Sequence, residues 1–330
     1  MKNFLERTTP MNKRVAGISV VGSANANLNA DWEGYPRQVN DLFTATDGCR
    51  KYFTRNYADK LGLPLLVFKT YKYGNSKDKK SKILVPMTLE EKLISRGITS
   101  TDDREFVKQL FECIDIELFG GTIAVKGHNL SITGAVQFNM GVNKYADTQV
   151  FKNTISSPYT NSNNKDATQS TNGSKLFTDE AHYFYDFTVE PKTYDYLKEL
   201  DNTFNGLTEE AYDFFKKALL EDVNSYNSVS KKGCYNEFAF FVELKEGSKK
   251  YLGELSRYAT FRKKENKNII DLSKLMDKLS EIYEDIEKIE MYSNQIDTDV
   301  VVSENWTKLD KENKLVSKSI INDEIDFSLI

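Results

Sequence analysis

The stretch CIDIELFGGTIAVKGHNLSITGAVQFNMG, residues 113–141, decides the fold class of this 330-residue chain. Apolar and polar residues alternate over 122–126, and the tripeptide GHN at 127–129 is typical of a turn. Alternation then resumes, and one face carries Leu130, Ile132, Val136, Phe138 and Met140. Because side chains of a strand alternate between its two faces, the pattern predicts a hairpin whose second strand runs from 130 to about 140.

Strand and helix signals continue on both sides of this hairpin. Val and Ile fill a strand candidate at 14–21, and Thr46 can cap a helix that ends before Gly62. Further candidates are helix 102–114, strand 182–190, helix 208–226, strand 238–244 and helix 271–291. Without the insertions the order is β-α-β-β-α-β. This order predicts an α+β fold, ferredoxin-like, in the modified form of RNA-recognition (RRM) domains with large insertions.

Composition excludes several classes of protein. The longest uncharged apolar run, 61–68, has eight residues, too few to span a membrane. The first ten residues contain no apolar signal core, so we expect a cytoplasmic protein. Three distant cysteines and two histidines leave little material for a disulfide framework, a zinc site or a His-based triad. We therefore expect no cofactor and no metal.

Charge is distributed unevenly along the chain. Residues 271–330 carry 15 acidic and seven basic residues, a balance of −8, which leaves +4 for the remainder because the whole chain carries −4. Six lysines and two tyrosines lie within 69–82, beside one aspartate. Lysines can neutralise the phosphates of a nucleic acid and tyrosines can stack on its bases. A run of charges is also typical of a solvated loop.

A polar segment separates the hairpin from the later elements. Thirteen of the 19 residues at 156–174 are Ser, Thr, Asn or Gln, and none is Ile, Leu, Val, Met or Phe. Because such a segment has almost nothing to bury, we expect an exposed arm.

Three segments resemble a known family. They are DIELFGG with SITGAVQFNMG at 115–141, NADWEGYPRQ at 29–38 and TDGCRKYFTRNY at 46–57. They are similar to the backbone subunit of type I CRISPR Cascade complexes, the seventh Cas protein family within the RAMP superfamily, and closest to its type I-B branch. The resemblance spans roughly 14–245.

This resemblance implies a hand-shaped molecule. A single RRM-like domain, 1–330, would form the palm, with a fingers-like insertion at 63–100 and a thumb-like arm at 142–178. Residues 246–330 would form a C-terminal helical extension with an acidic tail. Copies of the chain would stack along a crRNA, present it to target DNA, and bind other Cascade subunits. From the resemblance we expect a protein that is not an enzyme and does not bind a membrane.

Candidate RNA contacts follow from the residues and the resemblance together. Lys51 and Arg55 are four apart on a helix, away from an apolar stripe at Cys49, Phe53 and Tyr57. In a strand, Gln137 faces opposite to its apolar neighbours, toward the outer sheet face. The predicted RNA-binding set is Arg37, Arg50, Lys51, Arg55, Lys69, Tyr71, Lys72, Lys77, Lys79, Lys80, Gln137, Asn139 and Lys144. The predicted wedge of the thumb-like arm is Val150, Phe151 and Ile155.

Two other functions stay open at this point. Related type III backbone subunits cleave RNA with a carboxylate, and Asp31 or Asp147 could take that role with a divalent metal. The chain could also be a stand-alone module for single-stranded RNA. His128 is interpreted as a turn residue, His182 as structural, and the basic residues at 257–264 as a solvated patch.

Overall fold

A large mixed sheet forms the centre of the computed structural model, which describes residues 6–76, 80–160 and 170–320. Its ten strands follow the order β17-β15-β12-β1-β11-β9-β3-β2, and β8 and β10 pair with β11 outside this path. The fold therefore combines helices and strands, as expected, and it is mostly sheet. The ten strands are β1 Val15–Ala26, β2 Gln38–Val39, β3 Leu42–Ala45, β8 Val136–Phe138, β9 Gly141–Asn143, β10 Val150–Thr160, β11 Ser170–Val189, β12 Cys234–Leu244, β15 Ile286–Ser293 and β17 Leu315–Ser319.

Two helices cover one face of this sheet. Thr46 caps α1 and Thr208 caps α6, each by accepting a backbone N–H of the first turn, so both predicted helix starts are confirmed. Phe53 of α1 and Phe215 of α6 enter the larger of two apolar cores, together with Phe187 from β11. The helices of the chain are α1 Asp47–Lys60, α2 Leu89–Ser95, α3 Asp103–Phe111, α4 Ile114–Phe119, α5 Asp195–Leu200, α6 Glu209–Ser225, α7 Ser273–Ser280 and α8 Glu304–Leu309, with 3-10 turns η1 Pro191–Tyr194, η2 Leu255–Tyr258 and η3 Tyr283–Asp285.

The C-terminal segment covers the opposite face. Ile18 and Phe240 of the central strands pack there against Leu275 of α7 and Trp306 of α8, in a second apolar core. A three-stranded sheet of order β13-β14-β16, called the small sheet below, belongs to the same segment. Its strands are β13 Thr260–Lys264, β14 Lys267–Asp271 and β16 Thr298–Val301. Within the described residues, both faces of the central strands β1 and β12 are therefore covered.

The predicted helix 271–291 and the helical C-terminal extension are wrong. The helix ends at Ser280, and 286–293 forms β15, which pairs with β12 along the main sheet. Apolar residues at 282, 286 and 289 fit a helical period, but Ile286 and Ile289 are also buried in the strand. Because β12 would otherwise leave its backbone groups unpaired at an edge, pairing with it decides the conformation.

The predicted hairpin forms, but its second strand is shorter than expected. β6 (Gly120–Val125) and β7 (His128–Thr133) make a separate two-stranded sheet, and β8 pairs instead with β11. The break is at Gly134, where a Cβ atom would lie 2.1 Å from the backbone carbon of Phe119. Gly120 has φ +66, and a Cβ there would lie 2.0 Å from the Ile132 carbonyl oxygen. The glycines of this stretch therefore permit two backbone segments to cross in contact.

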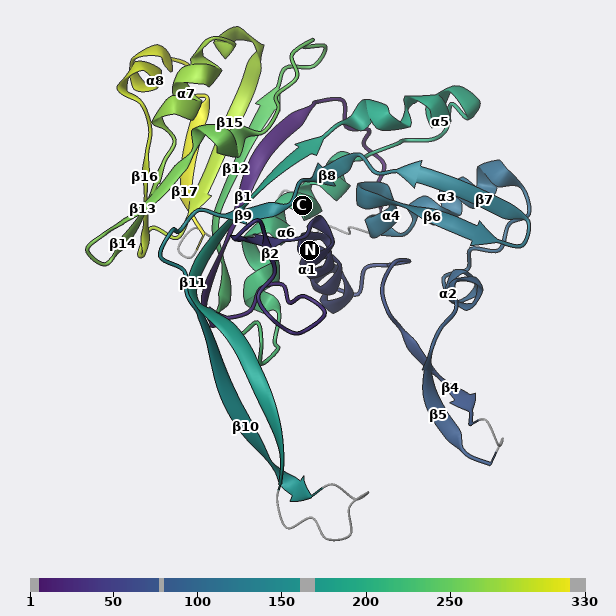
Figure 1. Cartoon of the computed structure of the whole chain (residues 1–330). Coiled ribbons are helices and arrows are strands. Elements are labelled where there is room, and N and C mark those ends of the chain that lie inside the picture. Colours follow the sequence, from purple (N-terminus) through teal and green to yellow (C-terminus); the bar gives the residue numbers. More distant parts are fainter. Residues whose placement is uncertain (1–5, 77–79, 161–169, 321–330) are drawn as a thin grey trace.

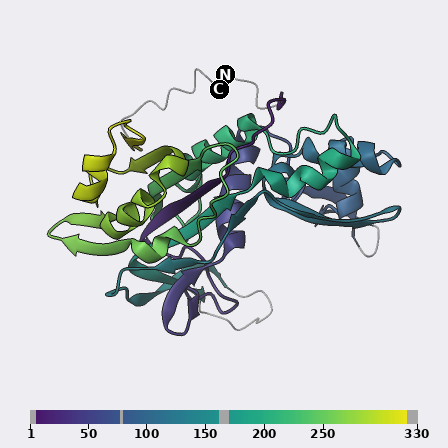
Figure 2. The same ribbon diagram turned by 90° about the horizontal axis from the view of Figure 1, so that it is seen from above.

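Two arms extend from the same side of the body (Figure 1; Figure 2 gives the view from above). The long arm consists of β10 and residues 170–178 of β11, which pair as an antiparallel ribbon. The short arm is the two-stranded sheet of β4 (Tyr71–Asn75) and β5 (Lys82–Pro86). Within the described ranges, no helix is both long enough and apolar enough to cross a membrane.

Candidate nucleic-acid interface

Three predicted residues meet beside α1, which lies between the two arms in Figure 1, and the side chains of Lys51 and Arg55 are 13% and 12% exposed. The Lys51 ammonium is 3.1 Å from an Asp47 carboxylate oxygen and 3.5 Å from the Gln137 amide oxygen. The Arg55 Nε is 3.2 Å from Asp115, and both cations lie over the Phe119 ring. We call Lys51, Arg55 and Gln137 the α1 cluster. Carboxylates and the Phe119 ring hold the two cations in place, so a phosphate that binds them competes with Asp47 and Asp115.

Arg50 does not belong to this surface, which corrects the prediction. Its side chain is fully buried, with Nη1 2.5 Å from Asp222 on α6 and Nε 3.2 Å from the Ser19 hydroxyl. The buried stripe of α1 runs through Arg50, Phe53, Thr54 and Tyr57. Arg50 thus takes a core position because α6 supplies a buried carboxylate as its partner.

Asn139 and Lys144 are committed to internal contacts as well. The amide of Asn139 exchanges two hydrogen bonds with Asp186 on β11. The Lys144 ammonium donates to the carbonyl oxygens of Ser256 and Ala259. Burial lowers the pKa of Lys144, although the charge of Asp186 acts in the opposite direction. Lys144 thus holds the C-terminal segment near β11 and Asn139 is bonded to β11 itself, so we remove both from the candidate interface.

Arg37 lies in a loop at the base of the long arm. Pro36 is buried, and Arg37 donates from Nη2 to the Ala30 carbonyl at 3.4 Å. The amide of Asn27 ties the same loop to the arm by donating to the Leu176 carbonyl at 3.2 Å. Sequence reasoning missed Trp32, whose side chain is 91% exposed in this loop. A lone tryptophan in a polar loop was the available signal.

The long arm carries an apolar face along its ribbon. Strand register places Phe151 opposite Phe177 and Ile155 opposite Gly173, on one face. The two phenylalanine rings stack at 6.1 Å, and the Lys175 ammonium lies over Phe177. Phe151 and Ile155 are exposed, as a wedge requires, but Val150 points to the other face and is half-buried. Phe177 and Lys175 were missed because their partners become visible only in the register.

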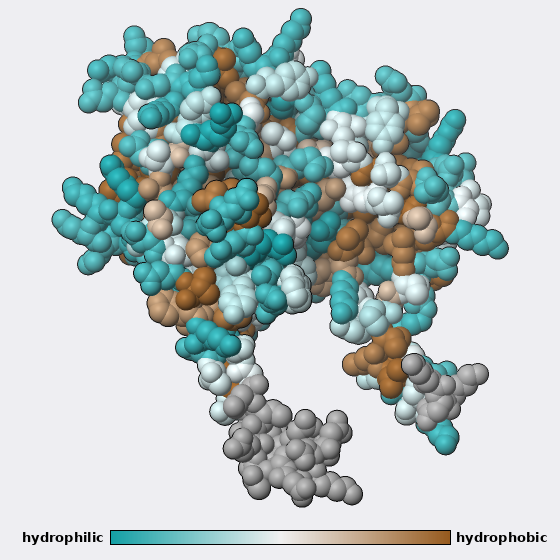
Figure 3. Space-filling view, viewed as in Figure 1, coloured by the Kyte–Doolittle hydropathy of each residue, from teal (hydrophilic) through white to brown (hydrophobic). Residues whose placement is uncertain are grey.

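The short arm has an aromatic face of its own. Tyr71 and Tyr73 share one face with Leu84, and all three are more than half exposed. Hydrophobic residues on this arm are also visible in Figure 3. The Lys69 ammonium lies over the Tyr71 ring, whereas Lys72 forms an ion pair with Glu91. Lys80 is exposed, and the predicted contacts Lys77 and Lys79 lie outside the described residues.

The two histidines and the two candidate catalytic carboxylates have different surroundings. His128 begins β7, stacks on Phe106 and lies 2.7 Å from Asp103, while His182 is buried in the root of the long arm. Asp31 accepts two backbone N–H groups within its loop, and Asp147 is exposed. Over 6–76, 80–160 and 170–320, no group of three or more His, Cys, Asp or Glu residues could hold a metal ion.

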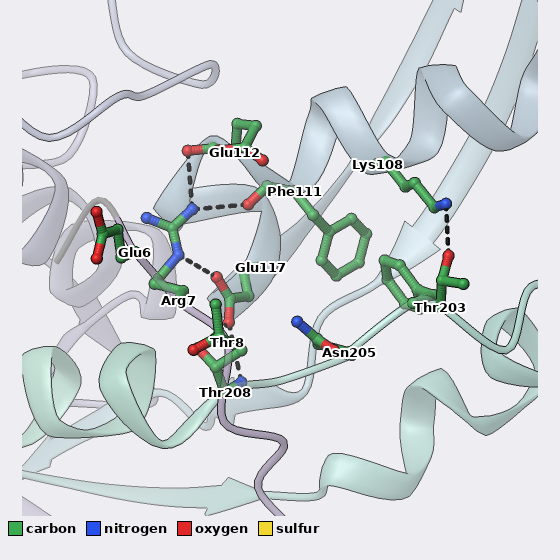
Figure 4. Close-up of a pocket in the computed structure, with 12 residues that line it drawn as sticks. Glu6, Arg7, Thr8, Lys108, Phe111, Glu112, Glu117, Thr203, Asn205 and Thr208 are labelled. Atoms are coloured by element: carbon green, nitrogen blue, oxygen red, sulfur yellow. Dashed lines mark hydrogen bonds and ion pairs between the residues drawn. The ribbon is translucent and has the colours of Figure 1, made fainter.

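A cavity of about 380 Å³ lies elsewhere, between the N-terminal segment, α3 and the loop at 203–208 (Figure 4). Arg7 crosses it and donates to Glu117 at 2.6 Å and to the carbonyl oxygens of Phe111 and Glu112. Burial raises the pKa of Glu117, while Arg7 and Thr208 act against that shift. None of the predicted RNA contacts lines this cavity.

Comparisons with known proteins give one family and one fold. A family model described as CRISPR-associated protein Cas7 matches residues 13–300. Among solved structures, a chain of a "CRISPR RNA-guided surveillance complex, pre-nicking" has a TM-score of 0.53 and 13% identity, covering 90% of this chain and 97% of that chain. A chain of a "CRISPR RNA-guided surveillance complex" has a TM-score of 0.45 and 13% identity, covering 87% and 91%. No curated protein matches the sequence.

Proposed function

The chain belongs to the CRISPR-associated protein Cas7 family, and from this premise we propose that it is a backbone subunit of a type I Cascade complex. Copies of the chain bind along the guide RNA (crRNA) and hold it for pairing with target DNA. Other Cascade subunits complete the assembly. The solved structure with a TM-score of 0.53 is a chain of an RNA-guided surveillance complex, which supports this assignment.

One observation carries the proposal: two arms with aromatic and basic faces extend beside the α1 cluster. Cations at Lys51 and Arg55 suit phosphates, and the exposed rings of Phe151 and Tyr73 suit unstacked bases. In this arrangement the protein binds the backbone of the guide and separates its bases. Base pairing then supplies the sequence specificity.

The strand order supports a ferredoxin-like palm. β12, β1, β11 and β9 lie side by side as antiparallel neighbours, with α1 and α6 on one face. The long arm then takes the place of the thumb and the short arm that of the fingers. Because the C-terminal segment covers the other sheet face, the guide runs along the α1 side and not across the sheet as in an RRM.

Assembly on RNA tests the proposal. We expect the mass of the complex to rise by several protein copies when a guide-length RNA is added, because each copy adds its own phosphate contacts. Native mass spectrometry with RNAs of increasing length measures the number of copies. One protein per RNA at saturation, whatever the RNA length, would contradict the backbone role and favour a stand-alone RNA-binding module.

The proposed role is structural and not catalytic. We expect Asp31→Ala and Asp147→Ala to leave any trace ribonuclease signal unchanged in Mg²⁺ or Mn²⁺. Cleavage of a labelled matched RNA is the measurement. Robust metal-dependent cleavage that either substitution abolishes would instead assign the type III-like activity.

A further inference from the structure

The root of the long arm, residues 143–149 and 178–182, is built from buried polar contacts. His182 on β11 is fully buried, with Nδ1 2.5 Å from Glu237 of β12 and Nε2 3.0 Å from Glu180. The side chain of Asn143 accepts the backbone N–H of His182, and Thr148 donates its hydroxyl to the Glu180 carbonyl oxygen. The strand that becomes the arm is therefore held at the point where it leaves the body.

Residues of the small sheet contact Glu180, Glu237 and His182 from the outer side. Lys263 of β13 donates to both carboxylate oxygens of Glu180, at 2.8 and 2.7 Å. Asn268 of β14 and Thr298 of β16 donate to Glu237 at 2.9 and 3.0 Å. Phe261 of β13 stacks on the His182 ring at 4.0 Å between centroids. Thus β13 contacts the root directly, whereas β14 and β16 contact Glu237, the partner of His182.

Packing within the described part of the arm does not fix the direction in which the arm extends. On its ribbon Phe151, Ile155 and their neighbours through Ser156 are exposed, so no core of its own fixes its direction. Hydrogen bonds and ion pairs are directional, and those at 180 and 182 lie on the same strand as the arm residues 173–178. A shift of the small sheet would therefore change the angle of the arm.

We infer that the small sheet is a brace that positions the long arm, with Lys263 and Glu180 as positioning residues. This assigns a role to a region whose basic residues are otherwise interpreted as a solvated patch. Lys263 acts by holding Glu180 and does not contact RNA itself. The effect of the brace on guide binding rests on the proposed function, whereas its effect on the arm does not.

Hydrogen exchange of the full-length free protein tests the brace directly. We expect Lys263→Ala and Glu180→Gln to speed exchange of backbone amides at 148–156 and 173–181 by about threefold to fivefold, the size expected from a partly exposed ion pair. Exchange in α6 should stay unchanged. Lys267→Ala is the matched control, because Lys267 pairs with Asp299 within the same small sheet. Unchanged exchange in both variants, or an equal rise in α6, would overturn the inference.

Lys263 and Glu180 carry opposite charges, so substituting each of them distinguishes a positioning role from direct RNA contact. Lys263→Ala removes a positive charge and Glu180→Gln removes a negative one. If Lys263 bound phosphate, these substitutions would change guide affinity in opposite directions and change its salt dependence. A brace predicts that both weaken guide binding, by about threefold to fivefold, with an unchanged salt slope. Opposite effects on affinity would overturn the positioning role.

Failure of this inference is distinguishable from failure of the proposed function. A wild-type chain that binds no guide RNA would refute the proposed function, while the exchange rates of the free protein would still decide the brace. Conversely, normal guide assembly with unchanged exchange in both variants would refute the brace alone.

Discussion

The two arms differ in how they join the body. β11 has 20 residues and belongs to both the central sheet and the long arm, and buried Thr178 donates to the Ala26 carbonyl at the junction. The short arm shares no strand with the central sheet. Its ties at the base are side-chain contacts, from Lys72 to Glu91 and from Lys92 to Thr70.

This difference assigns different tasks to the two arms. A ribbon continuous with a core strand takes its direction from the pairing of that strand and from the side-chain contacts at its root, because bending would break these hydrogen bonds. A hairpin joined by loops and a short helix can adjust its angle at little cost. We therefore expect the long arm to place a wedge at a defined position on the guide. We expect the short arm to follow the RNA backbone mainly through charge.

The largest expected effect is loss of assembly without the long arm. Replacing residues 151–177 with a two-residue turn should reduce multi-copy binding to a guide-length RNA by more than about tenfold, because neighbouring copies lose a shared contact. Native mass spectrometry measures the copies per RNA. The matched variant removes 71–86 of the short arm and should retain partial assembly. Equal losses in the two variants would remove the distinction between the arms.

A smaller loss of guide binding is expected when one residue of the wedge is changed. Phe151→Ala should weaken guide binding roughly fivefold to hundredfold, the range of about 1–3 kcal/mol for loss of one aromatic–base stack. Fluorescence anisotropy with labelled guide RNA gives the affinity. Thr154→Ala on the opposite face of the same strand is the control and should change little. A similar loss in both variants would indicate general disorder of the arm and not a stacking contact.

The root of the long arm should depend on pH. Burial disfavours the charged imidazole of His182, but Glu237 and Glu180 outweigh that cost and raise its pKa from 6.5 to about 8. A raised folded-state pKa stabilises the protein below pH 6.5, and this contribution of about 2 kcal/mol is lost as pH rises toward 8 and above. His182 and its two glutamates are also faced by the titratable groups of Lys263, Tyr145 and Tyr235.

Thermal unfolding measures this dependence. We expect the Tm of the wild type to fall between pH 6.5 and 8.5 by more than that of His182→Gln, which cannot titrate. Proteolysis of the long arm should follow the same curve, while proteolysis of the short arm should not. Identical pH profiles for wild type and variant would show that His182 is not charged in the folded protein.

The smallest effect should come from the lysines of the short arm. Lys69, Lys80 and Lys82 changed together to Gln should reduce the salt slope of guide binding by up to about 2, since each phosphate on a single strand contributes about 0.7. Tyr71→Ala should weaken binding with little change in slope, because stacking releases few ions. Salt titrations of guide affinity test both. Slopes that equal the wild type in the triple variant would leave these lysines without a role in RNA binding.

Local chemistry made much of the architecture predictable. The Thr46 cap, the helical stripe of Phe53 and Tyr57, the helix predicted at 208–226, and the alternation at 122–126 and from 130 onward indicate elements that the structure contains, although the second strand of the hairpin ends earlier than expected. The family resemblance, carried by the DIELFGG and SITGAVQFNMG segments, is confirmed by the match over 13–300. These signals depend on neighbours close in sequence, so they are readable without a fold.

Only the tertiary structure decided the burial of Arg50, the conformation of 286–293 and the covered sheet face, because each depends on partners distant in sequence. Arg50 is buried since Asp222, 172 residues away, neutralises it, and Ile286–Ser293 is a strand since β12 offers an edge. The sheet face expected to hold the ligand is covered by residues beyond 250. By itself the sequence determined the elements whose signals are local, such as α1, α6 and the β6–β7 hairpin, and the family they build. The choice between a surface cation and a buried one required the fold, because the cost of burying a charge depends on the partner that meets it.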